Sequence, residues 1–240
     1  MSSPTMMPMS LEEIAQAVQG RLIAGTAAID TPVATSTFTD SRQIVEGSVF
    51  VAIAGERVDG HDYVSKVGAQ GAVAAIVDHE IDGAGVPQIV VEDTVLALGA
   101  LAKHNIERRR ALETPFTVIG ITGSVGKTTT KDLMKALLAH IGPTIAPVGS
   151  FNNEIGLPLT SLKVHAETRF LVAEMGANHV GEIANLTSLV PPDIAVVLKV
   201  GVAHLGEFGS PERIAQAKSE IIRGLVPGGL SVLNANDEHV

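Results

Sequence analysis

The stretch with the clearest chemical meaning is a glycine-rich turn, VIGITGSVGKTTTK, at residues 118–131. An apolar run ends at Ile121 and a helical pattern begins at Lys127, so the glycines fall between a predicted strand and a predicted helix. In that position, glycines turn backbone N–H groups toward phosphate oxygens, and the helix N-terminus adds a partial positive charge. The predicted phosphate-binding residues are Thr122, Gly123, Ser124, Val125, Gly126, Lys127, Thr128 and Thr129.

Two side chains of this turn have separate predicted roles. Lys127 reaches the β- and γ-phosphates of a nucleotide such as ATP, and the Thr128 hydroxyl binds Mg²⁺. The strict pattern G-x-x-x-x-G-K-[ST] is not met, because Ile121 stands at its first position. A glycine-rich turn with a surface lysine is the alternative, and the flanking strand and helix favour the phosphate loop.

Composition limits the classes of partner that the chain can have. The 240 residues carry a formal net charge of −9, only 3% of them are aromatic and none is tryptophan. We expect no nucleic-acid partner, because an acidic chain with few aromatic rings lacks the attraction and the stacking that nucleic acids require. No signal peptide is visible, and no apolar run approaches the roughly 18 residues of a membrane span. With no cysteine, the chain suits a reducing cytoplasm, and we expect no membrane partner.

The chain divides at a polar, basic stretch, NIERRRALETP, at residues 105–115. A helical pattern ends there and a proline follows, which is typical of a linker between domains. The predicted domains are residues 1–112 and residues 113–240. Apolar runs alternate with helical patterns in both halves, so the predicted fold class is α/β.

Capping residues mark two helices in the first half. Ser10 and Glu13 form a predicted capping box for a helix that stops at Gly20, and Asp93 caps a helix over residues 94–105. The other predicted elements are a helix over residues 61–71 and strands over residues 48–55, 72–77 and 88–93.

Five apolar runs in the second half are separated by helical patterns. They cover residues 116–122, 144–148, 169–175, 194–200 and 230–234. Short apolar strands that alternate with helices predict a doubly wound, mostly parallel sheet with helices on both faces. The pattern stops just after the last run, so we expect the chain to be the front part of something longer.

One lysine of the second half lies beside the apolar stripe of its predicted helix. The segment SPERIAQAKSEIIRGL, residues 210–225, predicts a helix with Ser210 as its N-cap. Lys218 falls four residues after Ile214 and three before Ile221, which places it near the buried face. Burial lowers the pKa of a lysine, and a neutral amine can react with CO₂. The alternative is a lysine whose stem covers apolar surface while its amine reaches water.

Three further polar residues have both a chemical and a structural interpretation. Glu174 ends an apolar run, and the end of a strand beside the phosphate loop suits a Mg²⁺ ligand. A lone glutamate in that place is otherwise a solvated side chain. Asn152 and Asn153, in the stretch SFNNEIG, can face a substrate or a phosphate, or can form an Asx turn before a helix.

In combination, these motifs resemble the Mur ligase family, the ATP-dependent ligases that form amide bonds in peptidoglycan precursor synthesis. The resemblance is carried by TGSVGKTT, by TDSRQIVEG and DGHDY, by FLVAEMGANHVGEI, and by VAHLGEFGS and AQAKSEI. It extends from about Ser10 to Asp237, essentially the whole chain. The fold it implies is a small UDP-binding α/β domain followed by a P-loop ATP-binding domain.

The resemblance also implies roles for particular residues. The implied catalytic residues are Lys127, Glu174, His204 and Lys218, and the implied metal ligands are Thr128, Glu174, His204 and a carbamylated Lys218. The implied substrate-binding residues are Asp40, Ser41, Arg42, Asp59, Gly60, His61, Asn152 and Asn153. From the residues alone, Asp40 and Arg42 could equally form a turn with a structural salt bridge. Lys199 stands where the family commonly has asparagine, so the site geometry there could differ.

The implied reaction joins D-alanyl-D-alanine to UDP-N-acetylmuramoyl-tripeptide, with ATP and Mg²⁺. ATP phosphorylates the terminal carboxylate of the tripeptide, and the amine of the dipeptide attacks the acyl phosphate. The stretches NNEIG and EMGANHVGEI favour this branch over the one that adds the third residue to UDP-MurNAc-dipeptide. The phosphate loop would also suit a P-loop kinase or NTPase, and the first half a non-catalytic UDP-sugar-binding module. We expect a cytoplasmic monomer, with little or no ligase activity in the absence of the family's C-terminal domain.

Overall fold

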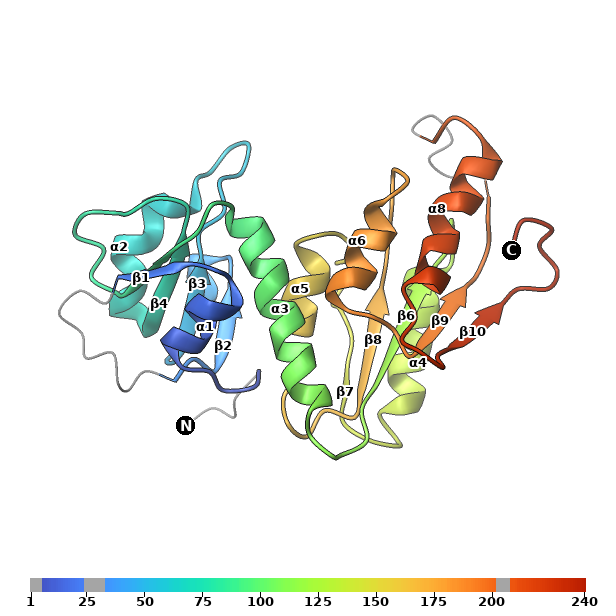
Figure 1. Ribbon diagram of the computed structural model, residues 1–240, viewed down its shortest axis with the longest axis horizontal. Helices are drawn as coiled ribbons and strands as arrows, with labels where there is room; N and C mark the ends of the chain where they lie inside the picture. Colours follow the sequence, from blue (N-terminus) through green and yellow to red (C-terminus); the bar gives the residue numbers. More distant parts are fainter. Residues whose placement is uncertain (1–5, 24–32, 202–207) are drawn as a thin grey trace. The chain divides into compact units, whose positions relative to one another are not determined.

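The computed structural model describes residues 6–23, 33–201 and 208–240, and it separates into two compact units. One unit is Met1–Arg108 and the other is Arg109–Val240, so the division lies at 108/109, whereas the predicted boundary is 112/113. It falls inside the long helix α3, Thr94–Arg110 (Figure 1). The predicted α/β class is confirmed, and each unit has a sheet of its own. None of the helices in the described part of the chain is both long and apolar enough to cross a membrane.

Among the described residues of the first unit, five strands form one sheet in the order β1-β5-β4-β3-β2. Strands β2 to β5 are parallel, and β1 is antiparallel to β5. The bounds are Arg21–Ile23 for β1, Ser36–Phe38 for β2, Ser48–Val51 for β3, Ala72–Val77 for β4 and Gln88–Val90 for β5. Strands β1 and β2 were not predicted, because three residues are too few to show an alternating pattern.

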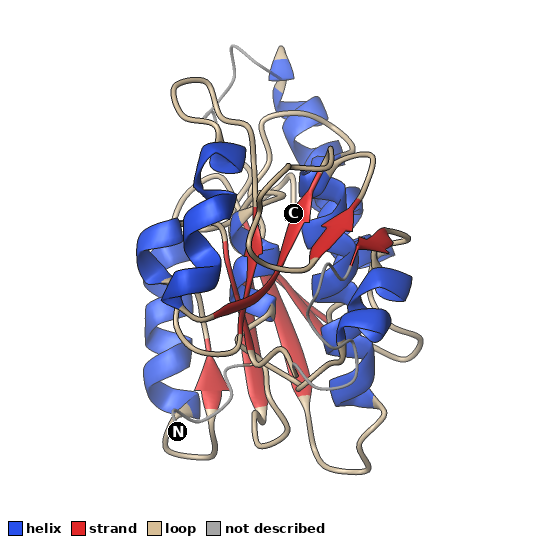
Figure 2. Ribbon diagram, turned by 90° about the vertical axis from the view of Figure 1, so that its left-hand side faces the viewer, coloured by secondary structure: helices blue, strands red, loops and turns tan. Residues whose placement is uncertain are grey.

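Helices cover both faces of this sheet (Figure 2). Val64 and Val67 of α2 pack in one buried cluster with Ala75 and Val77 of β4. Alternate residues of β4 point to the opposite face, on the side of α1 and α3. The bounds are Leu11–Ala17 for α1, Val64–Val67 for α2, Ser41–Gln43 for the short helix η1, Gly60–Tyr63 for η2 and Gly68–Gln70 for η3.

The predicted helix caps of the first unit are present. Ser10 Oγ accepts a hydrogen bond from the backbone N–H of Glu13 at 3.1 Å. Asp93 Oδ1 accepts from two backbone N–H groups in the first turn of α3, at 2.7 and 2.9 Å. The Glu13 carboxylate binds His104 Nε2 at 2.9 Å instead of turning back to complete a capping box. This side-chain contact links α1 to α3.

The segment over residues 61–71 differs from its prediction as one helix. It consists of η2, α2 and η3 in succession and ends at Gly71, whose φ is +107°. Two glycines of this region lie so close to other segments that a side chain would clash, and these tertiary contacts leave no signal in the helical periodicity of the sequence. A Cβ on Gly60 would lie 2.7 Å from the backbone N of Ile53, and one on Gly68 would lie 2.6 Å from a methyl of Val86. Tertiary packing therefore sets the path of this segment.

Among the described residues of the second unit, five strands form a sheet in the order β10-β9-β6-β8-β7, and every pairing is parallel. This confirms the predicted doubly wound sheet and all five predicted strands. Because β6 and β8 are neighbours, the phosphate loop and Glu174 leave the sheet side by side. The bounds are Thr117–Thr122 for β6, Thr144–Ile145 for β7, Phe170–Glu174 for β8, Ile194–Val197 for β9 and Leu230–Leu233 for β10.

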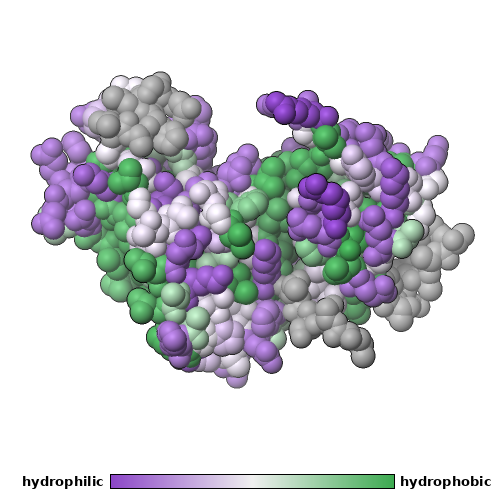
Figure 3. Space-filling view, turned by 180° about the vertical axis from the view of Figure 1, so that it is seen from behind, coloured by the Kyte–Doolittle hydropathy of each residue, from purple (hydrophilic) through white to green (hydrophobic). Residues whose placement is uncertain are grey.

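Helices lie on both faces of the second sheet, with α6 and α8 packed together on the face opposite α4 (Figure 1). Helix α4 buries one side against the sheet, whereas its Leu133 and Leu137, and Ile141 just after the helix, are each more than half exposed. Figure 3, seen from behind, shows apolar side chains scattered among polar ones on this side. The bounds are Lys127–Leu138 for α4, Gly156–Ser161 for α5, Glu182–Leu189 for α6 and Pro211–Arg223 for α8.

The end of α3 belongs to the core of the second unit. The Arg109 side chain is 1% exposed, and its Nη2 donates to the carbonyls of Thr168 at 2.7 Å and Pro115 at 3.0 Å. Its guanidinium lies 4.9 Å from the centre of the Phe116 ring. Burial lowers the pKa of Arg109. The stretch predicted as a linker thus also fixes the chain just before β6.

Candidate active site

The phosphate loop turns sharply between β6 and α4. Gly126 has φ +86°, in the region where a side chain is strained, and a Cβ on Gly123 would lie 3.0 Å from that of Leu198. Both positions therefore require glycine. Lys127 Nζ donates to the carbonyl of Gly123 at 2.7 Å, so the amine folds back over the loop. The Thr122 hydroxyl is buried and makes no hydrogen bond to any part of the chain that the structure describes.

Glu174 joins the loop to the neighbouring strand. Its side chain is only 1% exposed, and its two oxygens are bonded separately. Thr128 Oγ1 donates to Oε2 at 3.1 Å, and Asn152 Nδ2 donates to Oε1 at 2.9 Å. Glu174 is therefore not the solvated side chain that a lone glutamate at a strand end would be. The Glu174 carboxylate therefore lies next to the Thr128 hydroxyl, which is the predicted Mg²⁺ ligand.

A cavity of about 310 Å³ opens beside these groups. Its lining includes Gly123, Lys127, Asn152, Asn153 and Lys218. Both asparagines are thus brought to the site. Asn153 Oδ1 also accepts from the backbone N–H of Gly156 at 2.9 Å, which is the Asx-type cap considered as its structural role. In the predicted phosphate loop, Val125 and Thr129 are exposed.

Lys218 lies on the buried face of α8, as the helical pattern predicts. It is 4% exposed, and its Nζ lies 6.0 Å from the centre of the Phe208 ring. Burial, with a smaller contribution from the positive charge of Lys127, lowers the pKa of Lys218 to about 8. Burial also lowers the pKa of Lys127, against the opposing effect of Glu174. The Lys218 amine is therefore partly neutral near physiological pH, and the snorkelling alternative does not describe it.

Two buried side chains that the sequence pattern does not single out position this site. Glu220 of α8 is 6% exposed and accepts from the backbone N–H groups of Gly181 at 2.7 Å and Ala184 at 3.0 Å. It therefore caps α6 from the helix that carries Lys218. Lys131 is 1% exposed and donates to the carbonyl of Pro147 at 2.9 Å, which fixes the loop before Asn152. Helical spacing gives no signal that distinguishes either residue from a surface charge.

Two residues considered from the sequence have no described place at the cavity. Lys199 has an exposed side chain, and only its backbone carbonyl reaches the loop, accepting from Ser124 N at 2.8 Å. His204 lies outside the described residues.

A second cavity, of about 450 Å³, lies in the first unit. Thr39, Asp40, Ser41, Arg42, Gly60 and Tyr63 are among the residues that line it, so four of the predicted substrate residues come together. Arg42 donates from Nε to Asp40 Oδ1 at 2.8 Å and from Nη2 to Oδ2 at 2.7 Å. This bond holds the pKa of Asp40 well below its usual range. The predicted salt bridge is thus present, and the Arg42 side chain remains largely open to solvent.

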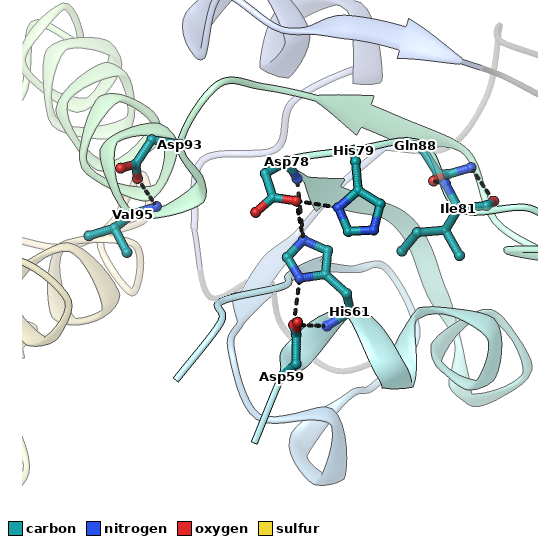
Figure 4. Close-up of polar contacts among 8 residues, drawn as sticks. All are labelled: Asp59, His61, Asp78, His79, Ile81, Gln88, Asp93 and Val95. Atoms are coloured by element: carbon teal, nitrogen blue, oxygen red, sulfur yellow. Dashed lines mark hydrogen bonds and ion pairs between the residues drawn. The ribbon is translucent and has the colours of Figure 1, made fainter. Parts of the chain in front are cut away.

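His61 and Asp59 are not among the residues that line this cavity. His61 is 7% exposed, and its Nδ1 lies 2.6 Å from Asp59 Oδ1 (Figure 4). Its Nε2 accepts from the backbone N–H of Asp78 at 3.2 Å. Gly60, between them in sequence, does line the cavity.

Comparison with known proteins identifies the family of the chain. The family model for the Mur ligase middle domain matches residues 121–240, and the model for the Mur ligase family, catalytic domain, matches residues 35–106. A UDP-N-acetylmuramoyl-tripeptide–D-alanyl-D-alanine ligase of Mycobacterium tuberculosis is 42% identical over 256 positions, which cover 98% of this chain and 50% of that protein. The chain belongs to the Mur ligase family. This Mur ligase spans about half the length of the curated relatives it matches.

Solved structures of Mur ligases resemble the chain throughout. A crystal structure of MurF from Acinetobacter baumannii is 39% identical, with a TM-score of 0.86, covering 98% of this chain and 50% of the other. The MurF ligase of Thermotoga maritima in complex with ADP is 38% identical, with a TM-score of 0.72, covering 82% of this chain and 45% of the other. The resemblance noted in the sequence is thus confirmed in three dimensions.

Proposed function

We propose that this Mur ligase uses ATP to join D-alanyl-D-alanine to UDP-N-acetylmuramoyl-tripeptide through an acyl phosphate. The observation that carries the proposal is the partly buried hydrogen bond between Thr128 of the phosphate loop and Glu174, beside a cavity that Lys127 and Lys218 line. The names of the relatives supply the substrates. The setting we propose is the cytoplasm, with a monomeric protein and no nucleic-acid or membrane partner.

The residues at the loop fit ATP and Mg²⁺. Two kinds of polar group are available to phosphate oxygens: the buried Thr122 hydroxyl, which has no hydrogen-bond partner among the described residues, and the backbone N–H groups of the glycine-rich turn. A hydroxyl and a carboxylate are the oxygen donors that Mg²⁺ prefers. Thr128 and Glu174 would hold the ion, with His204 as the predicted further ligand. Bound Mg²⁺ would neutralise the charge that develops on the phosphate oxygens.

The side chains of the chain carry out the binding and orientation that the reaction needs. Lys127 would leave its bond to the Gly123 carbonyl and donate to the β- and γ-phosphates. The tripeptide carboxylate attacks the γ-phosphorus, and the bond to the ADP oxygen breaks. The amine of D-alanyl-D-alanine then attacks the acyl carbon, loses a proton, and phosphate leaves with one carboxylate oxygen. Asn152 would hold Glu174 in place throughout.

Lys218 has the protonation behaviour that a carbamylated lysine requires. With a pKa of about 8, a fraction of its amine is neutral at pH 7 to 8. Its Nζ would attack the carbon of CO₂, so that a C–N bond forms while one C–O π bond breaks and its electron pair moves to oxygen. The nitrogen would then lose a proton to solvent. The product is an anion that can bind a metal ion, whereas the ammonium form would repel it.

The first unit would bind the UDP end of the substrate. Asp40 and Ser41 offer groups that can bond a uracil edge or a ribose hydroxyl, and Arg42 can face the diphosphate. The third-residue branch of the family remains the nearest competing function. Its solved relative is 22% identical, with a TM-score of 0.58, which shows only that the fold is shared.

The proposal is tested at the nucleotide site by calorimetric titration with β,γ-imido-ATP and Mg²⁺. We expect saturable binding at one site that requires Mg²⁺ and is weakened by Lys127→Ala. Binding that is independent of both Mg²⁺ and Lys127, or no binding in a sample whose circular dichroism shows a folded protein, would overturn it.

A further inference from the structure

A second cluster of polar side chains lies in the first unit, away from the cavity lining. His61 of η2 and the consecutive residues Asp78 and His79, just after β4, bring one ligand atom each to within 4.8 Å of one another (Figure 4). His61 Nε2 lies 3.2 Å from Asp78 Oδ1, and His79 Nδ1 lies 2.5 Å from the same oxygen. Two imidazole nitrogens thus converge on one carboxylate oxygen.

The hydrogen bonds of His61 assign its proton to the ring nitrogen that faces away from the cluster. Nδ1 lies 2.6 Å from Asp59 Oδ1, and a carboxylate only accepts, so Nδ1 donates. In the neutral ring, Nε2 then carries a lone pair toward Asp78. A carboxylate that orients a histidine through its far nitrogen is the usual second-shell support of a metal ligand.

We propose that His61, Asp78 and His79 form a binding site for a late first-row divalent metal ion, with Zn²⁺ as its simplest occupant. Two imidazoles and a carboxylate suit Zn²⁺, Co²⁺, Ni²⁺ or Cu²⁺, whereas Mg²⁺ and Ca²⁺ prefer sites made of oxygen alone. The site is separate from the Mg²⁺ position proposed beside the phosphate loop. Solvent supplies the remaining ligand at this surface position.

The spacing fits such an ion with one local adjustment. Ligand atoms about 2.0–2.1 Å from a tetrahedral ion lie roughly 3.3 Å apart, which matches the 3.2 Å between His61 Nε2 and Asp78 Oδ1. His79 is stacked on His61 with ring centres 4.9 Å apart, and it must rotate to point Nδ1 at the ion. Its side chain is 64% exposed, so that rotation is unobstructed. His61 gives up its long bond from Asp78 N as the ion takes the lone pair.

Metal binding would join η2, which contributes to the lining of the first-unit cavity, to the segment just after β4. His61 lies in η2, whose Gly60 and Tyr63 line that cavity, whereas Asp78 and His79 follow β4. An ion bound to the folded state alone raises its stability by mass action. A Zn²⁺-dependent increase in melting temperature is therefore a readout that does not involve catalysis.

The test is a titration of the metal-free chain with Co²⁺, followed by visible absorption, and a thermal melt with and without Zn²⁺. We compare the unmodified chain with His79→Ala and with His179→Ala. His179 is a matched control, because it is 66% exposed and pairs with one carboxylate, that of Glu182, at 3.0 Å. Both variants change exposed residues, so both are expected to fold. Asp59→Asn tests the supporting carboxylate.

We expect one equivalent of Co²⁺ with d–d absorption of a low-symmetry site, and a Zn²⁺-dependent rise in melting temperature. His79→Ala weakens binding more than tenfold, Asp59→Asn weakens it about tenfold, and His179→Ala leaves it unchanged. Equal binding in His79→Ala and His179→Ala, or no saturable binding at all, would overturn the proposal. The cluster would then be a hydrogen-bonded network that holds η2 to β4.

Discussion

The two candidate binding sites hold their charged side chains in different ways. Beside the phosphate loop, Glu174 and Lys218 are 1% and 4% exposed. Hydrogen bonds hold Glu174 at the end of β8, and packing holds Lys218 within α8. In the first unit, the Arg42 side chain is largely exposed, and its side-chain hydrogen bonds within the described part of the chain go to Asp40 on the same turn. Substitutions of the charged residues beside the phosphate loop are thus expected to affect both stability and ligand binding. Substitutions of the charged residues at the first-unit cavity are expected to affect ligand binding alone.

The largest expected effect is on stability, from Lys218→Met. The folded-state pKa of about 8 lies below the ordinary 10.5, so the unfolded chain binds more protons between these values and stability rises with pH across that range. Below pH 8 the full cost of the buried charge is present, about 3 kcal/mol for a shift of this size. We expect Lys218→Met to stabilise the second unit at pH 7 by up to that amount, and the gain to vanish by about pH 10.5.

Urea unfolding from pH 6.5 to pH 10.5 measures this effect. Lys163→Met, at an exposed position of the same unit, is the matched control and should leave the pH profile unchanged. A destabilised Lys218→Met variant at pH 7 would show that the amine is solvated or paired, contrary to our account of the site.

Lys127→Ala should produce the next largest effect, on nucleotide affinity. Loss of charge-assisted bonds to phosphate is expected to weaken β,γ-imido-ATP binding about 30-fold, or roughly 2 kcal/mol. Lys135→Ala, on the exposed face of α4, should bind like the unmodified chain. Equal affinity for the two variants in calorimetry would mean that Lys127 does not contact phosphate.

Glu174→Gln should reduce the contribution of Mg²⁺ to nucleotide binding. The amide keeps the size of the side chain and one acceptor oxygen for Thr128 or Asn152, but it loses the charge that attracts the ion. We expect about a tenfold loss of affinity in the presence of Mg²⁺ and little change in its absence. A loss of the same size without Mg²⁺ would indicate a packing role for Glu174.

The smallest expected effect comes from Arg42→Ala. Because an exposed ion pair contributes little to stability, the melting temperature should not change measurably. UDP-sugar affinity should fall about fivefold, and added salt should reduce the difference, since the contact is open to screening ions. A clear drop in melting temperature would place Arg42 among the structural residues and remove the contrast between the two sites.

The same contrast separates what the sequence could predict from what it could not. Glu174 and the phosphate loop were predictable because apolar strands and glycines mark the carboxyl ends of neighbouring parallel strands. Lys218 was predictable from its spacing to Ile214 and Ile221, both of which are buried. The cap that Glu220 provides to α6 was not predictable from the sequence, because it depends on how α6 and α8 pack against each other.

In the first unit, the sequence indicated the right turn at Asp40 and Arg42 but not which residues face the cavity. The substrate role of His61 stays a prediction, and the structure places its ring between Asp59 and Asp78, outside the lining of the cavity. The close approach of Gly60 to Ile53, which sets the direction of η2, is a tertiary contact without a local signal. Contacts with neighbouring segments determine the position of a short turn of this kind. The position of a strand end is determined by pairing within the sheet.

The most direct test of the central claim is calorimetric titration of the chain with UDP-MurNAc-tripeptide and, separately, with UDP-MurNAc-dipeptide, each with β,γ-imido-ATP and Mg²⁺. Our account predicts saturable binding of the tripeptide at least about tenfold tighter than that of the dipeptide. Equal affinities, or no UDP-sugar binding in a demonstrably folded sample, would contradict it.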